Sequence, residues 1–193
     1  MKTLRVLIAG LFLFLTYQCK EDKKDKDGAS EDMEVKKEEV IKEVKVVKFT
    51  MEPKSDSDVK GDVTFREEEG KVMMTANLSG LSEGEHAIHI HENADCSADD
   101  GSSAGGHWNP TAEPHGKWGA EEGFHRGDIG NFTADAEGNA TVEFSTEMWC
   151  LGCEDETKNL MGKAVIVHQG TDDFTSQPSG AAGARVSCTG IIQ

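Results

Sequence analysis

The chain has 193 residues, a length that predicts one domain of ordinary size with at most a small appendage. Hydrophobic residues make up 36% and charged residues 29%, and 21 glycines against 4 prolines favour turns and short strands over long helices. The net charge of −16 excludes nucleic-acid binding through phosphate neutralisation, because no basic face is available. All of this charge comes from residues 61–193, which hold 7 basic and 23 acidic residues.

The N-terminus has the pattern of an export signal. Lys2 and Arg5 form its positive region, and Val6 to Leu15 form an apolar segment of about ten residues, too short for a stable transmembrane helix. Cys19 follows directly. Residues 1–19 therefore resemble a bacterial lipoprotein signal, which implies that Cys19 is lipidated and becomes the mature N-terminus. Secretion without a lipid is the alternative, because Thr16–Gln18 are not the small residues usual before such a cysteine.

A densely charged segment comes next, over residues 20–43. It is almost entirely Lys, Glu and Asp, so it buries too little apolar surface to offset the entropy of ordering, and we expect a flexible tether. Its start, Lys20-Glu21-Asp22, is similar to a surface-export tag of some Gram-negative lipoproteins. We expect an extracytoplasmic, membrane-anchored protein, with the periplasm-facing and cell-surface placements both open.

Short apolar alternations broken by turn residues begin at residue 44 and predict β-strands. Glu69-Gly70 is an expected turn, and residues 137–139 are expected to close a hairpin. No segment after residue 43 keeps a helical period over three turns, so residues 44–193 are expected to form an all-β domain, a barrel or a sandwich. The eight expected strands are 44–51, 62–67, 71–78, 85–92, 131–134, 140–145, 163–169 and 185–192.

Two long stretches, residues 93–130 and 170–184, do not alternate, and loops of this length in a compact domain are usually functional. They hold three of the seven histidines. His89 and His91 are two apart on one strand, so both rings lie on the same face as a chelating pair, whereas His86 has the opposite parity. A solvent-facing pair is the alternative. Imidazoles suit zinc and copper, and three histidines with an aspartate fit a closed zinc site.

Several motifs together resemble the copper/zinc superoxide dismutase family over residues 44–193. They match its copper strand, its zinc loop, its later copper ligand with the start of the electrostatic loop, and its C-terminal signature. The resemblance implies an eight-stranded Greek-key barrel or sandwich with two long functional loops. The motifs are residues 84–92 (GEHAIHIHE), 106–110 (GHWNP), 114–116 (PHG), 125–131 (HRGDIGN), 167–168 (VH), 172–174 (DDF) and 180–188 (GAAGARVSC).

The resemblance implies two metal ions that share one ligand, His107. It also implies that His86 supports the copper strand, and that Asp172 hydrogen-bonds His89 and His115 and so fixes their orientation. The implied copper ligands are His89, His91, His107 and His168. The implied zinc ligands are His107, His115, His125 and Asp128.

Five cysteines are present, and without Cys19 four remain, which permits three disulfide connectivities. The resemblance pairs Cys96 with Cys188. Cys150 and Cys153 lie outside the widespread family pattern. The acidic residues 154–156 would oppose a reactive thiolate there, which favours a local structural disulfide over free thiols and over a redox or metal role.

The resemblance implies dismutation of superoxide into dioxygen and hydrogen peroxide. Copper would cycle between Cu(II) and Cu(I), zinc would be structural, and His107 would release copper and carry a proton to the departing peroxide. Arg185 would attract and orient the anion. The alternatives are an extracytoplasmic copper- or zinc-binding lipoprotein without turnover and a structural surface lipoprotein. The sequence leaves the oligomeric state open, a homodimer included.

Overall fold

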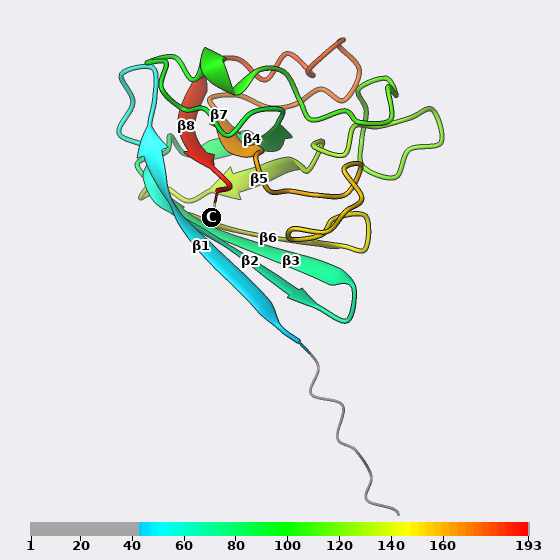
Figure 1. The fold of residues 1–193 in the computed structure, drawn as a ribbon. Helices are drawn as coiled ribbons and strands as arrows, with labels where there is room; N and C mark the ends of the chain where they lie inside the picture. The colour runs from blue at the N-terminus through cyan, green and yellow to red at the C-terminus, as the bar shows by residue number, and fades with distance from the viewer. Residues whose placement is uncertain (1–42, 193) are drawn as a thin grey trace, which may run out of the picture. The chain divides into compact units, whose positions relative to one another are not determined.

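Eight β-strands carry the alternating segments in a computed structural model that describes residues 43–192 (Figure 1). Each strand begins and ends within two residues of its expected position. The only helical element among these residues is a single 3-10 turn, Ser102–Ala104 (η1), and none of them forms a helix long and apolar enough to cross a membrane. The predicted all-β class is therefore confirmed. The strands are β1 (Lys45–Pro53), β2 (Lys60–Glu68), β3 (Lys71–Ser79), β4 (Gly84–His91), β5 (Gly130–Ala134), β6 (Ala140–Thr146), β7 (Ala164–His168) and β8 (Arg185–Gly190).

The strands hydrogen-bond in the order β5-β4-β7-β8-β1-β2-β3-β6, and every neighbouring pair is antiparallel. β1 joins the two halves, because Lys45–Met51 pair with β2 while Glu52 and Pro53 pair with β8. β6 returns beside β3 after the chain has formed β4 and β5, which is the Greek-key connection. The result is the expected eight-stranded Greek-key barrel, nearly closed.

Of the two turns predicted from the sequence, one joins a hairpin and the other does not. Glu69 and Gly70 have φ of 55° and 78°, both left-handed, and join β2 to β3 by the tight turn that twisted hairpins prefer. The turn over residues 137–139 also forms, with the N–H of Asp135 donating to Asn139 O at 2.9 Å. However, β5 and β6 stand at opposite ends of the strand order. This turn carries the chain from one half of the barrel to the other, so it does not close a hairpin.

The two faces of β4 have different surroundings. Ile88 and Ile90 point into the main core, whereas His89 and His91 point to the opposite face, as the period of two predicts. That second face is buried as well. In Figure 1 the two long loops, after β4 and after β7, run over the outer side of β4, β7 and β8. The loops therefore cover the outward-facing pair His89 and His91 and bury it.

Two disulfides tie loops to the barrel or to themselves. Cys96, in the first long loop, is bonded to Cys188 of β8, across a sequence separation of 92. Cys150 and Cys153 are bonded to each other in the connection between β6 and β7. For Cys150 and Cys153 the structure therefore has the local disulfide, and not free thiols.

Candidate metal centre

A third histidine, at the end of β7, lies beside the β4 pair, and a β-bulge in β8 faces it. His168 lies on the same outer face as His89, whose cross-strand partner on β7 is Ile166. Val167 pairs with Ser187, but His168 pairs with Arg185, so β8 has one extra residue at this point. Bulges of this kind re-aim side chains next to functional sites. Here the bulge sets Arg185 directly opposite His168.

Four histidines meet over this outer face, three from the strands and one from the loop. The Nε2 atoms of His91 and His168 are 3.3 Å apart. His107 arrives from the first long loop and forms an isolated bridge with His91, and its ring centroid lies 4.0 Å from that of His89. One nitrogen from each ring lies within 4.8 Å of the others in the group His89, His91, His107 and His168.

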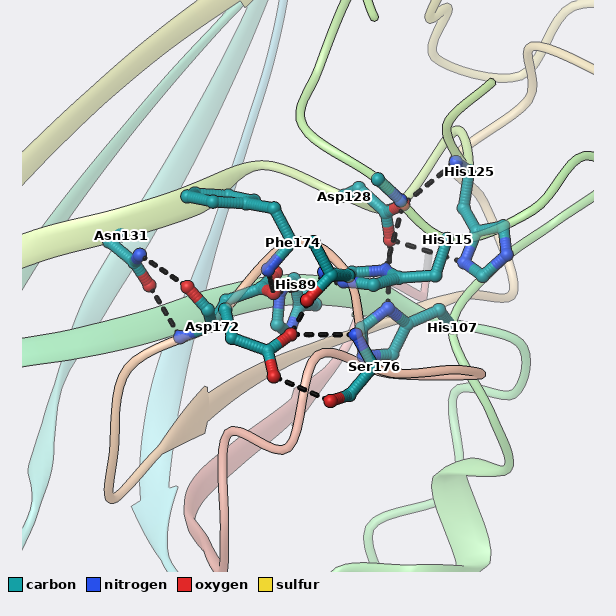
Figure 2. Close-up of polar contacts among 12 residues, drawn as sticks. His89, His107, His115, His125, Asp128, Asn131, Asp172, Phe174 and Ser176 are labelled. Carbon is teal, nitrogen blue, oxygen red and sulfur yellow. Dashed lines mark hydrogen bonds and ion pairs between the residues drawn. The ribbon is translucent and has the colours of Figure 1, made fainter. Parts of the chain in front are cut away.

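A second cluster lies on the other side of His107, wholly within the first long loop (Figure 2). Asp128 is its centre. Its carboxylate oxygens lie 2.8 Å from His107 Nδ1, 3.0 Å from His115 Nδ1 and 3.2 Å from His125 Nδ1. Oδ2 of Asp128 also accepts the backbone N–H of His125 at 2.8 Å and of Gly116 at 3.1 Å, which fixes the carboxylate in the loop. The cluster consists of His107, His115, His125 and Asp128, again with ligand atoms within 4.8 Å of one another.

Unpaired nitrogens test whether these clusters fit metal ions. His89 Nδ1 and His107 Nε2 are buried without any hydrogen-bond partner, and an unpaired buried polar atom costs about 1–3 kcal/mol. Nδ1 of His115 and of His125 face only the Asp128 carboxylate, at 3.0 and 3.2 Å. In each cluster the ligand atoms lie within 4.8 Å of one another. Four imidazoles suit copper, and three imidazoles with a carboxylate suit zinc, so the residues fit both ions.

Asp172, in the second long loop, connects the two clusters. Its Oδ2 accepts a hydrogen bond from His89 Nε2 and its Oδ1 from His115 Nε2, each at 2.9 Å (Figure 2). Because a carboxylate only accepts here, both Nε2 atoms carry a hydrogen, and both Nδ1 atoms face the clusters. Asn131 at the start of β5 holds Asp172 by a reciprocal pair of bonds, at 2.8 and 2.9 Å, to its backbone N–H and C=O.

The protonation of the site follows from burial and from these carboxylates. Burial lowers the pKa of His91 and His168 well below the ordinary value and that of His107 to about 4, so their lone pairs are available at neutral pH. Burial also opposes ionisation of Asp128 and Asp172. The hydrogen bonds from the histidines outweigh it and hold the pKa of both carboxyls well below the usual range. Both are therefore anionic ligands or acceptors at pH 7.

Arg185 lies beside the first cluster at the wall of a cavity. Its Nη1 donates to Gly101 O and its Nη2 to Gly105 O, both at 2.7 Å, so the guanidinium is held in one orientation. Burial lowers the pKa of Arg185, but a guanidinium stays cationic in proteins. The cavity, about 510 Å³, is also lined by His91, His107 and His168. A small anion that enters it meets a fixed positive charge next to the histidine cluster.

A profile of the copper/zinc superoxide dismutase family (SODC) matches residues 59–192 of the chain. The chain belongs to this family. Copper–zinc superoxide dismutase 2 of Aquifex aeolicus is 35% identical over 143 residues, which cover 72% of this chain and 82% of the relative. The copper–zinc superoxide dismutase of Caulobacter vibrioides is 37% identical over 137 residues, covering 69% of this chain and 78% of the relative. Among solved structures, a SOD-like protein from Bacillus subtilis is similar, with a TM-score of 0.67, 26% identity, and coverage of 75% of this chain and 97% of that one.

The structure of this dismutase-family chain brings every metal-site residue named from the sequence into or against the two clusters. His86 stays out of them, and its Nδ1 instead donates to the backbone oxygen of His168 at 3.1 Å. Sequence reasoning assigned no role to Asn131 or Gly105, which hold Asp172 and Arg185. Asn131 falls within a family motif, which is a signal for it. The role of Gly105 depends on where its carbonyl points, and no sequence pattern gives that.

Proposed function

We propose that this chain is a superoxide dismutase that converts two superoxide anions and two protons into dioxygen and hydrogen peroxide. One observation carries the proposal. Two clusters with copper-type and zinc-type donors share His107, and the first opens on the cavity where Arg185 is fixed. Copper would be held by His89, His91, His107 and His168, and zinc by His107, His115, His125 and Asp128.

The chain's own residues prepare this chemistry by holding rings and protons. When bound, copper supplies one-electron redox chemistry between Cu(II) and Cu(I), whereas zinc has one accessible oxidation state and a structural role. Asp172 fixes His89 and His115 with their Nδ1 atoms toward the clusters. Asp128 fixes Nδ1 of His107, so Nε2 of that ring faces the first cluster. His107 Nε2 is the atom at which a proton can be held and passed to the departing peroxide.

Arg185 gives the cavity its affinity for an anion although the chain is acidic. Salt screens charges farther than about 8–10 Å away, and a cleft with low-dielectric walls concentrates the field of the charges that line it. Arg185 lies on that wall, and bound metal ions add positive charge that the formal count of −16 omits. The acidic surface therefore does not prevent superoxide from entering.

The test is superoxide decay by the purified protein, stripped of metal and reloaded with copper, zinc, both or neither. Metal content is measured in the same samples. We expect rapid decay whenever copper is present, and decay no faster than in buffer with zinc alone. If the protein binds both ions in stoichiometric amounts but superoxide decays no faster than in buffer, the proposed catalytic function is wrong. The chain is then a metal-binding protein without turnover.

We also propose that the protein is exported and anchored by a lipid on Cys19. Residues 1–42 lie outside the described residues, and the support comes from the signal-like pattern of residues 1–19. The two disulfides add support for export, because such bonds persist in oxidising compartments.

We expect the full chain, expressed in Gram-negative cells fed an alkyne-tagged palmitate, to carry the label after click detection. Cys19→Ser should carry none, because the thiol is the only attachment point in the proposal. Protease added to intact cells separates surface display, where the protein is degraded, from a periplasm-facing anchor. Equal labelling of the two proteins would exclude Cys19 as the lipidated residue.

A further inference from the structure

One peptide group, between Gly105 and Gly106, links Arg185 to the histidine cluster. Its carbonyl oxygen accepts hydrogen bonds from His91 Nδ1 at 3.0 Å and from Arg185 Nη2 at 2.7 Å. Its N–H donates to Oε2 of Glu92 at 3.0 Å. A peptide group is planar, with N–H and C=O pointing in opposite directions, so a contact that fixes one fixes the other.

This peptide group needs an anchor because it joins two glycines. Gly105 has a φ of +76°, and a Cβ there would lie 2.6 Å from Oε2 of Glu92 and 2.8 Å from Nδ2 of Asn93. With a ψ of −157° as well, this conformation is essentially confined to glycine, and adjacent glycines have the greatest freedom to rotate. Glu92 removes that freedom from two sides, since its backbone N–H also donates to Gly106 O at 3.0 Å.

We propose that Glu92 is a positioning residue that sets both His91 and Arg185 through the Gly105–Gly106 peptide. The inference rests on the proposed function, because His91 would hold the metal and Arg185 would bind the anion that reacts there. A carbonyl only accepts, so Gly105 O puts the hydrogen on His91 Nδ1 and leaves Nε2 to the cluster. The Glu92 carboxylate polarises the peptide and strengthens its carbonyl as an acceptor for both partners.

Glu92 has two effects on anion binding, and they have opposite signs. Its side chain lines the same cavity as Arg185, so its negative charge repels an anion. Its hydrogen bond to Gly106 favours the anion by holding Arg185 in place. Gln removes the charge but keeps an oxygen that can accept the N–H, whereas Ala removes both. The difference between Glu92→Ala and Glu92→Gln therefore isolates the hydrogen bond.

The experiment uses the full chain loaded with copper and zinc, with azide as the anion. Azide affinity is read from the copper absorption spectrum, and the electron paramagnetic resonance spectrum of Cu(II) is recorded without azide. We expect Glu92→Ala to bind azide about three- to tenfold more weakly than Glu92→Gln, the loss typical of one hydrogen bond. We expect the copper spectrum of Glu92→Ala to differ from that of the wild type. Glu92→Gln should keep the wild-type spectrum and bind azide at least as tightly as the wild type.

Glu156→Gln is the matched control, because this exposed carboxylate lines a neighbouring depression together with Glu92 and is not bonded to Gly106. It should keep the wild-type copper spectrum. If Glu92→Ala equals Glu92→Gln in azide affinity and in spectrum, Glu92 does not position either residue. Failure of the proposed function is visible separately, because the wild-type protein would then bind copper without removing superoxide.

Discussion

Replacing Arg185 with alanine is expected to lower kcat/KM for superoxide about 10- to 100-fold, within the roughly 10- to 1,000-fold range of electrostatic steering. Arg185 supplies the fixed positive charge on the wall of the cavity, where its guanidinium is bonded to Gly101 O and Gly105 O. Arg185→Lys should lose less, because it keeps the charge but cannot reproduce the planar two-point fit. Pulse radiolysis at several ionic strengths measures the effect, and the decline of the rate with salt should weaken in Arg185→Ala.

Arg66→Ala is the control for net charge, because this exposed arginine of β2 pairs with Glu68 and does not line the cavity. Both substitutions remove one positive charge, one at the wall of the cavity and one on the exposed face of β2. A loss of rate in Arg66→Ala as large as in Arg185→Ala would mean that overall charge, and not the cavity, governs the approach of superoxide.

The second large effect concerns stability. Replacing Cys96 and Cys188 with serine should lower the free energy of unfolding by about 4–5 kcal/mol, because the bond closes a loop with a sequence separation of 92 in the unfolded chain. The bond also ties the first long loop to β8, where Arg185 begins the strand. Urea unfolding of the metal-free protein measures the change, since bound metal would add its own stabilisation.

The other disulfide offers an internal comparison. Replacing Cys150 and Cys153 with serine opens a loop with a separation of only 3, for which chain entropy gives about 2 kcal/mol. Both double variants lose one disulfide and gain two hydroxyls. Equal losses in the two variants would contradict an origin in the unfolded chain and would point to local packing around the sulfurs.

The strands and the histidine pair follow from the sequence because they depend on local periodicity. The side-chain period of two alone separates His89 and His91 from His86, whichever strands lie next to β4. Turn chemistry located the β2–β3 hairpin through Glu69 and Gly70. The same local reasoning was wrong for β5 and β6, because a turn fixes how the chain reverses and not which strand it then joins.

The sequence by itself thus determined the all-β class, the strand positions and, through its motifs, the family and the residues to examine. The export-type N-terminus stays a prediction. The tertiary structure alone decided how those residues are held. Asp172 reaches two clusters because Asn131 fixes its backbone, and Glu92 reaches Arg185 only through the direction of one peptide. Such contacts join residues far apart in the chain or depend on the orientation of a carbonyl. They are set by the path of the loops over the barrel, which no local pattern encodes.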